Sequence, residues 1–136
     1  MNKPITYNKI LESLSKKLIG TLYIKTSHTH GFEVDLNDII YLQGKYSHTH
    51  VWLTEHLDCL ALHHIGFYQE DLDPRFFFRI NNSAIINLLH VKEIQYQPEK
   101  LITLSDNHSV KPSESKWKAF KTRYEQFLEG KISFTP

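Results

Sequence analysis

The stretch Arg75–Ile94, "RFFFRINNSAIINLLHVKEI", carries the pattern that decides the fold. Two short runs rich in aromatic and β-branched residues, "FFFRI" and "AIIN", flank the polar turn Asn81–Asn82–Ser83. Asn and Ser favour turns because their short side chains hydrogen-bond to the nearby backbone. A further run of this kind, "VKEIQY", follows after a few residues. The stretch therefore predicts antiparallel strands joined by short connections.

The residues before this stretch predict more strands and one short helix. Five short runs with a period of two are separated by Gly, Asn, Asp or His clusters: "LYIKT", "GFEVDL", "DIIYLQ", "HVWLT" and "DCLAL". This rhythm is typical of an antiparallel meander. The segment "HHIGFYQEDL" predicts a short helix that ends before Pro74, because proline disfavours the helical conformation in the residue before it.

The residues after it predict a hairpin and a closing helix. Asp106–Asn107 forms a good turn between "LITLS" and "HSVKP". A helix then begins at Ser113 or Ser115. Its four aromatic residues share one face at helical spacing: Trp117, Phe120, Tyr124 and Phe127.

The first residues of the chain predict an additional amphipathic helix. Thr6 is a suitable N-cap, the segment Thr6–Leu18 has apolar residues at helical spacing, and Gly20 is a suitable stop. Its apolar face is available for a homodimer or for packing on its own domain. We expect this helix within residues 1–20, one domain at 21–129 and a tail at 130–136.

Size and composition indicate a single folded domain. The chain has 136 residues, of which 40% are hydrophobic and 12% aromatic. The lone Cys59 excludes an internal disulfide. No apolar run is long enough to span a bilayer, and the N-terminus lacks the order of a signal peptide. We therefore expect a cytoplasmic protein without a membrane partner.

The charges are few overall but unevenly placed. The formal net charge of +1 gives no general attraction to polyanions. Glu55–Asp73 holds five acidic residues and no Lys or Arg, whereas Lys111–Lys131 holds six basic residues. A nucleic-acid site on this chain would therefore be a local patch, with the acidic stretch facing elsewhere.

The tetrapeptide Ser-His-Thr-His occurs twice, at Ser27–His30 and at Ser47–His50. Alternate residues of a strand point to the same side, so each copy could present two imidazoles to a metal ion. No carboxylate stands at a matching spacing, and we expect no metal site. The first copy is expected at the tip of a hairpin and the second on a partly exposed strand.

The sequence offers little that points to catalysis. It has no nucleophile elbow, Gly-rich phosphate loop or acidic pair. Cys59 lies in an apolar alternation, where a packed strand thiol is expected rather than a nucleophile. We expect no enzyme, no cofactor and no small-molecule substrate.

The order of these segments resembles the LytTR-type DNA-binding domain, the output module of many bacterial response regulators in two-component systems. The resemblance covers about Leu22 to Leu128. Its most specific parts are "FFR", the "NNS" turn, Ile86–Asn87 and "HVKEI". It implies a mainly β fold with α+β content: an elongated stack of small antiparallel sheets, with helices at both ends and a short one in the middle. It also implies a sequence-specific transcriptional regulator that lays loops into successive grooves of double-stranded DNA.

In that family three surfaces contact DNA, and the resemblance carries them over to three segments of this chain. The implied DNA-binding residues are Lys45, Ser47, His48, Thr49, His50, Asn81, Asn82, Ser83, Lys111, Ser113 and Lys116. The lysines can neutralise phosphates, and the Ser and Thr hydroxyls can donate to phosphate oxygens. Asn82 can match the adenine edge in the major groove. Arg79 is either a DNA contact or a structural ion-pair residue beneath the turn.

Two departures from the family pattern leave an alternative open. Glu114 stands where the family commonly has a basic residue, and Asn81–Asn82 stands where it often has His followed by Arg or Asn. A carboxylate near phosphates is unfavourable, although it suits a helix N-terminus. The alternative is a LytTR-like interaction or sensing module without tight DNA binding. The chain is either a stand-alone regulator or the output part of a longer one.

Overall fold

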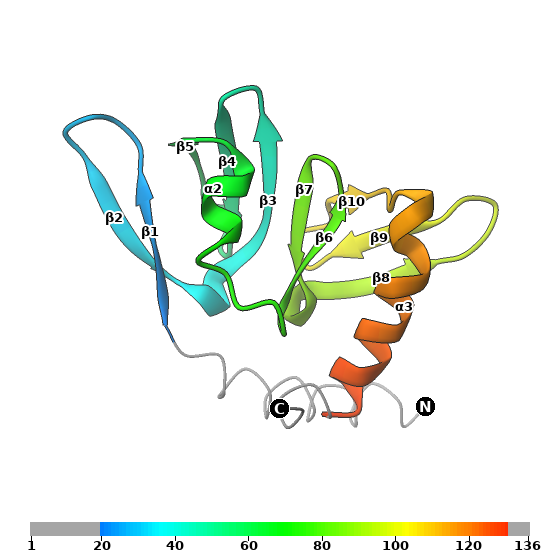
Figure 1. The fold of residues 1–136 in the computed structure, drawn as a ribbon. Coiled ribbons are helices and arrows are strands. Elements are labelled where there is room, and N and C mark those ends of the chain that lie inside the picture. The colour runs from blue at the N-terminus through cyan, green and yellow to red at the C-terminus, as the bar shows by residue number, and fades with distance from the viewer. Residues whose placement is uncertain (1–19, 131–136) are drawn as a thin grey trace.

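The computed structural model describes residues 20–130, which form three small antiparallel sheets and two α-helices (Figure 1). The mainly β fold predicted from the sequence is confirmed. The predicted helix at Thr6–Leu18 and the tail at 130–136 lie outside the described residues, apart from Gly130. Within residues 20–130, no helix is both long and apolar enough to cross a bilayer.

The first sheet is a hairpin of β1 (Thr21–Lys25) and β2 (Gly31–Asp35). After it, the chain does not continue as a meander. Asp35 Oδ1 accepts a hydrogen bond from the backbone N–H of Asn37 at 2.9 Å and caps the 3₁₀ helix η1 (Leu36–Asp38). This turn redirects the chain into a different sheet. The predicted five-strand meander is therefore wrong at the step from the second strand to the third.

The second sheet has five strands in the order β5-β4-β3-β7-β6. A meander of β3 (Ile39–Lys45), β4 (His48–Leu53) and β5 (Asp58–Leu62) makes one half. The hairpin of β6 (Phe77–Asn81) and β7 (Ala84–Asn87) makes the other half, with β7 paired to β3. The hairpin predicted from the turn Asn81–Asn82–Ser83 is confirmed.

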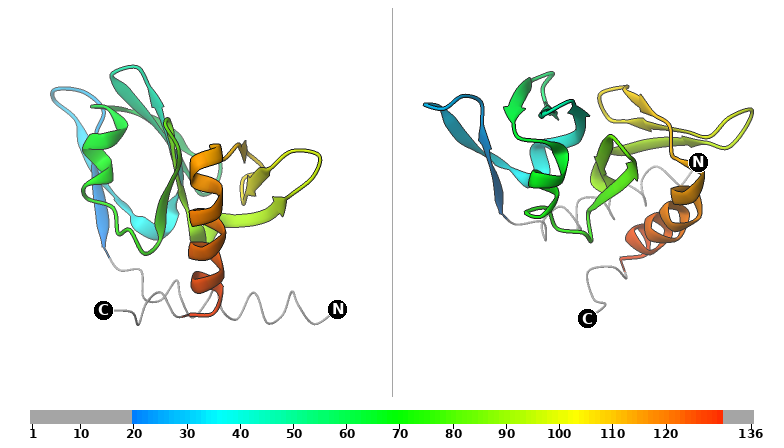
Figure 2. Two further views of the ribbon diagram at one scale, coloured as in Figure 1. Left: turned by 45° about the vertical axis from the view of Figure 1, so that its right-hand side comes forward. Right: turned by 45° about the horizontal axis from the view of Figure 1, so that its top comes forward.

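The third sheet and the two helices complete the fold. After the 3₁₀ helix η2 (Leu88–His90), β8 (Val91–Gln95), β9 (Leu101–Leu104) and β10 (Ser109–Val110) form a three-stranded sheet. The predicted middle helix is shorter than expected, with α2 covering Ile65–Gln69. The closing helix α3 (Glu114–Leu128) begins directly after Ser113, one of its two predicted starts. The sheets stand side by side along the molecule (Figures 1 and 2).

The aromatic face of α3 holds two sheets together. Phe120 and Phe127 are fully buried. The Phe120 ring contacts Phe78 of β6, and the Phe127 ring contacts Phe76, the residue before β6, each at 5.9 Å between centroids. Trp117 is half-buried and meets Tyr96, which follows β8, at 5.6 Å. The predicted aromatic face is therefore confirmed. It packs α3 across the junction of the second and third sheets.

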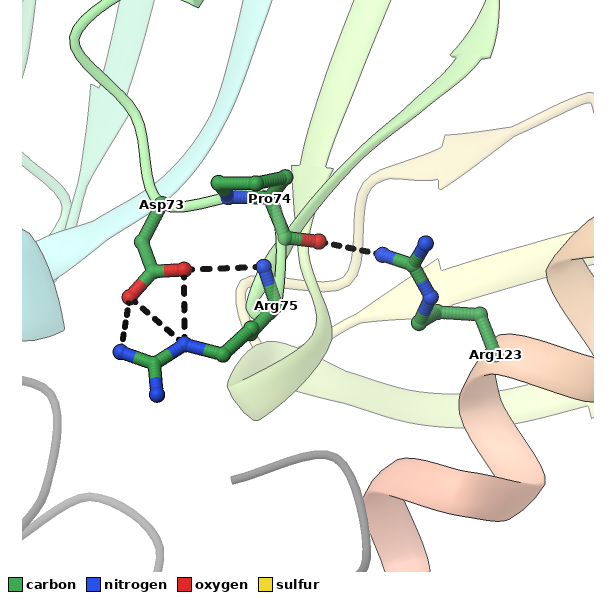
Figure 3. Close-up of polar contacts among 4 residues, drawn as sticks. All are labelled: Asp73, Pro74, Arg75 and Arg123. Carbon is green, nitrogen blue, oxygen red and sulfur yellow. Dashed lines mark hydrogen bonds and ion pairs between the residues drawn. The ribbon is translucent and has the colours of Figure 1, made fainter. Parts of the chain in front are cut away.

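The far end of α3 is tied to the turn that precedes β6 (Figure 3). The Arg123 guanidinium donates to the backbone carbonyl of Pro74. Beside it, Asp73 accepts hydrogen bonds from the backbone and side chain of Arg75, with Nη2 to Oδ2 at 2.7 Å. These hydrogen bonds from Arg75 lower the pKa of the Asp73 carboxyl. The contacts fix the end of the helix against the start of β6.

Asn87 joins the two halves of the five-stranded sheet from inside. Its side chain is fully buried, and Nδ2 donates to the carbonyls of Leu36 and Ile39 at 3.3 and 2.9 Å. Its Oδ1 accepts from the backbone N–H of Leu89 at 3.0 Å. One amide thus satisfies backbone groups at both short 3₁₀ helices, which would otherwise be buried without a partner.

We predict that Asn87→Ala lowers the free energy of unfolding by about 1–3 kcal/mol, because it leaves buried backbone groups unsatisfied. Urea unfolding followed by circular dichroism measures the change. Asn82→Ala, at an exposed asparagine of the same hairpin, is the matched control and should stay within about 0.5 kcal/mol of the wild type. Equal stability of the two variants would contradict this role for Asn87.

Candidate nucleic-acid interface

Three connections project from one edge of the molecule: the β3–β4 turn, the β6–β7 turn and the segment between β10 and α3 (Figure 1). They contain Lys45–His48, Asn81–Ser83 and Lys111–Lys116, and we call them together the loop edge. Because β3 pairs with β7, the first two turns lie two strand spacings apart, about 10 Å. That spacing is on the scale of a single DNA groove, which is about 12 Å wide on the major side.

Hydrogen bonds join the three connections to one another. The backbone N–H of Gly44 donates to the carbonyl of Ser83 at 2.7 Å, which ties the end of β3 to the β6–β7 turn. On the other side of that turn, Asn81 Nδ2 donates to the carbonyl of Lys111 at 2.8 Å. The N–H of Ser113 also donates to the carbonyl of Ile80 at 3.1 Å. The loop edge is therefore one connected unit.

Two neighbouring asparagines of the β6–β7 turn have different roles. Asn81 Oδ1 accepts from the backbone N–H of Ser83 at 2.8 Å and lies 3.2 Å from its hydroxyl. Together with the bond to Lys111, these contacts occupy the Asn81 amide inside the protein. The side chain of Asn82 is exposed at the tip. Of the two residues, Asn82 is the one whose amide is presented outward.

Arg79 supports this turn from beneath. Its Nε donates to the carbonyl of Asn81 at 3.1 Å, and Nη2 donates to the carbonyl of Asn82. Nη1 donates to Oε1 of Gln69, at the end of α2, at 2.5 Å. Of the two alternatives for Arg79, the structural one is confirmed, but the predicted ion pair is wrong, because its hydrogen-bond acceptors here are carbonyl oxygens. The planar guanidinium suits this arrangement since its donors are fixed in a fork.

The β4 segment alternates between the core and the outer face. Thr49 is fully buried, and its hydroxyl donates to the carbonyl of His63 at 3.0 Å. This geometry corrects the expectation that Thr49 offers its hydroxyl to a phosphate, because the odd residues of the strand face the core. His48 lies on the outer face, with Nδ1 3.2 Å from the exposed Ser47 hydroxyl. The second Ser-His-Thr-His copy is partly exposed, as predicted.

His50 belongs to an aromatic cluster set back from the turn. Its ring stacks on Trp52 with 4.0 Å between centroids, and Nε2 lies 2.5 Å from Oδ2 of Asp58. Trp52 in turn meets His108 of the β9–β10 hairpin at 4.4 Å. A shallow groove beside this cluster is lined by Gln43, Gly44, Lys45, His50 and Trp52. A DNA contact by His50 would compete with its bond to Asp58 and stays a prediction.

The third segment presents cations and one anion at the start of α3. Lys111 and Lys116 are exposed, and Ser113 is half-buried at the N-cap position. Glu114 is exposed in the first turn of the helix. Both lysines and the carboxylate are therefore at the surface, and along the chain Glu114 lies between Lys111 and Lys116.

Part of the acidic stretch lies away from the loop edge. Glu55 is in the β4–β5 turn, which closes β4 at the end opposite the β3–β4 turn. Asp73 pairs with Arg75 before β6 begins, again opposite the β6–β7 turn. Figure 1 shows the connection from α2 to β6 at the far side of the sheet from the hairpin tips. Glu55 and Asp73 therefore lie away from the hairpin tips, whereas Glu70 lines a hollow with Gln69 and Arg79, beneath the β6–β7 turn.

Sequence reasoning missed one residue at the tip. Tyr46 is 98% exposed in the β3–β4 turn and has a φ of 60°, a conformation that residues other than Gly seldom adopt. Its signal in the sequence was an aromatic residue between Lys45 and Ser47, inside a turn. It gives the tip an apolar surface beside its polar groups.

The two histidine pairs lie in different sheets, since the first copy is in the β1–β2 loop and the second begins β4. Within residues 20–130, no three His, Cys, Asp or Glu side chains are grouped so as to hold a metal ion. Burial, and then the charge of Asp58, raises the pKa of the Cys59 thiol. A raised pKa is the opposite of what an activated nucleophile needs.

Comparison with known proteins identifies the class. The family model of the LytTr DNA-binding domain matches residues 30–125, so the chain belongs to that family. Among solved structures, it is similar to the LytTr DNA-binding domain of a protein described as a methyl-accepting/DNA response regulator from Bacillus cereus. The TM-score is 0.64 at 22% identity, covering 76% of this chain and 94% of the other. No curated protein matches the chain.

We predict that Arg79→Lys loosens the β6–β7 turn while the charge is kept, because lysine cannot form the fork of hydrogen bonds. The free energy of unfolding should fall by roughly 1–3 kcal/mol. Hydrogen exchange measured by NMR should become faster at the Ser83 amide and stay unchanged in β1. Arg75→Lys, which alters an exposed arginine at the other end of β6, is the control. Unchanged exchange at Ser83 would rule out this supporting role.

Proposed function

We propose that this protein is a sequence-specific DNA-binding transcriptional regulator that contacts duplex DNA through the loop edge. The observation that carries the proposal is the hydrogen-bonded unit of three connections, which presents polar and cationic side chains from one edge. Membership of the LytTr DNA-binding domain family supports a DNA-binding regulatory role in general terms. Such a regulator would act on DNA in the cytoplasm as the output part of a response regulator or alone.

The exposed residues divide into two kinds of contact. Lys45, Lys111 and Lys116 would neutralise phosphates, and the hydroxyls of Ser47 and Ser113 would donate to phosphate oxygens. Such contacts set the position of the protein on the duplex without reading sequence. Asn82 would carry sequence readout, because its exposed amide can donate and accept together at an adenine edge. His48, beside Ser47, would reach a phosphate or a base edge.

A second candidate is an interaction or sensing module without tight DNA binding. The exposed Glu114 between Lys111 and Lys116 favours it, because a carboxylate there repels phosphate. The near-neutral charge of the whole chain also favours it. Binding to random genomic duplex fragments across a salt series separates the two candidates. A regulator binds with a steep salt dependence, whereas the module shows no binding even at low salt.

For sequence readout, we expect Asn82→Ala to lower specific binding more than non-specific binding, by roughly 1–3 kcal/mol for a bidentate base contact. The measurement is the ratio of affinities for a selected site and for random duplex. Since Asn82 is exposed, the variant should fold normally. If the ratio stays unchanged in a folded variant, the turn is only structural and the proposed readout is wrong.

For phosphate contacts, we expect Lys116→Ala to weaken binding to all sequences alike. The slope of log affinity against log salt should flatten by about one counterion, because one phosphate is no longer neutralised. Lys92→Ala, which removes an exposed lysine of β8, is a control of equal charge change. A flatter slope in both variants alike would indicate a general charge effect rather than a contact by Lys116.

The position of Glu114 gives a gain-of-function prediction. Glu114→Arg should tighten duplex binding, most strongly at low salt, by replacing a charge that repels phosphate. It should also cost roughly 0.3–1 kcal/mol of helix stability, because the carboxylate stabilises the helix N-terminus. Glu125→Arg makes the same charge change near the other end of α3 and should leave affinity nearly unchanged. Equal affinities of wild type and Glu114→Arg at low salt would place Glu114 away from DNA.

A further inference from the structure

The loop between β1 and β2, Ser27–His30, projects from the same side of the molecule as the loop edge. We call it the outer loop. In Figure 1 its tip and the β3–β4 turn point to the same side with the end of β5 between them, and both views of Figure 2 keep it in line with the other connections. The family model begins only at residue 30, so nearly all of this loop lies before the matched region. Both Ser-His-Thr-His copies therefore lie on the same side of the molecule, with the end of β5 between them.

The hairpin that carries the outer loop is firmly attached to the domain. Leu22, Ile24 and Val34 are buried in the common core. Near the tip, the buried Tyr68 of α2 donates its hydroxyl to the carbonyl of Leu62, the last residue of β5. Burial raises the pKa of that hydroxyl, and a hydrogen bond from the Lys25 backbone opposes the rise. The Tyr68 hydroxyl therefore interacts with both the end of β1 and the end of β5.

The outer loop also has a defined conformation of its own. Ser27 Oγ accepts from the backbone N–H groups of Thr29 and His30 at 3.2 and 3.1 Å. The N–H of Thr26 donates to the carbonyl of His30 at 3.0 Å and closes the loop. At its base, a Cβ on Gly31 would lie 2.2 Å from the hydroxyl of the exposed Tyr23, so a larger residue there would displace the Tyr23 ring. The loop is therefore organised before any partner binds.

Its exposed side chains are hydrogen-bond donors suited to phosphate. His28, Thr29 and His30 are all exposed. The Thr29 hydroxyl lies 2.8 Å from Nδ1 of His30, and when it donates there the ring proton is on Nε2, available to a partner. The segment from Thr21 to Phe32 contains Lys25 and no carboxylate. Uncharged donors and one cation, without a nearby anion, favour an oxyanion as the partner.

We propose that the outer loop is a fourth contact with duplex DNA, in which His28 and His30 donate to the phosphate backbone and the Thr29 hydroxyl orients the His30 ring. This inference rests on the proposed function, since it extends the same row of contacts by one loop. Both copies of the tetrapeptide would then contact the phosphate backbone. The first copy would bring His28 and His30 to the phosphates, and the second would bring His48 and the Ser47 hydroxyl.

The test compares variants of the whole chain on one duplex at low and moderate salt. The double variant His28→Ala/His30→Ala removes the imidazole donors, and we expect it to bind about two- to tenfold more weakly, as for the loss of one or two hydrogen bonds. His28→Glu should weaken binding further at low salt, because it places a negative charge beside phosphates. The matched control is His56→Glu, in the exposed β4–β5 turn at the opposite end of the sheet.

The outcomes separate this inference from the proposed function. Weaker binding by His28→Glu and by the double alanine variant, with His56→Glu close to the wild type, supports the fourth contact. If the wild type binds duplex and all of these variants bind equally well, the outer loop does not touch DNA and only this inference fails. If the wild type binds no duplex at low salt, the proposed function fails and the inference with it. Circular dichroism and urea unfolding confirm that each variant is folded.

Discussion

The hydrogen bonds around the Asn81–Asn82–Ser83 turn are the constraint on which the candidate interface depends. This turn receives the Gly44 N–H on one side and gives the Asn81 side-chain N–H to Lys111 on the other. Without these bonds, the three connections would be independent surface loops, which are generally the most mobile parts of a domain. With them, the tips of two hairpins and the start of a helix keep one fixed spacing.

Fixed spacing matters because the chain has little charge with which to attract DNA. Its net charge is +1, so under the proposed function affinity would come from a few groups that meet phosphates at the right positions. Arg79 shows the difference between groups that support the turn and groups that face outward. Its guanidinium is used beneath the turn, donating to the carbonyls of Asn81 and Asn82, and so positions the exposed Asn82 amide. The outward groups are mainly lysines, serines, histidines and one asparagine.

The positions of two acidic residues fit this arrangement. Asp58 and Asp73 accept from His50 and Arg75 at the end of the sheet away from the hairpin tips. Glu114 is the exception, since it lies exposed within the third segment. Its carboxylate favours the helix N-terminus, and under the proposed function it would oppose phosphate and so balance helix stability against affinity for DNA. The contribution of each effect can be separated because only the second depends strongly on salt.

The sequence by itself determined the local features of this protein. The period of two in "HTHVWL" predicted a strand with its histidines on one face, and the aromatic spacing from Trp117 to Phe127 predicted the buried face of α3. The turn at Asn81–Asn82–Ser83 followed from its residue types alone. These features depend on neighbours in the chain, so a pattern of a few residues is enough to specify them.

Only the tertiary structure decided which elements are neighbours and what each polar group does there. A period of two fixes the face of a strand but not its partner, so the sequence could not show that β3 pairs with β7 rather than with β2. The burial of Thr49 followed from which side of the sheet meets the core, and the contact of Arg79 with Gln69 came from the position of α2 beside the β6–β7 hairpin. The place of the outer loop on the same side as the second histidine pair was set in the same way. It depends on long-range packing, to which residues far apart in the chain contribute together.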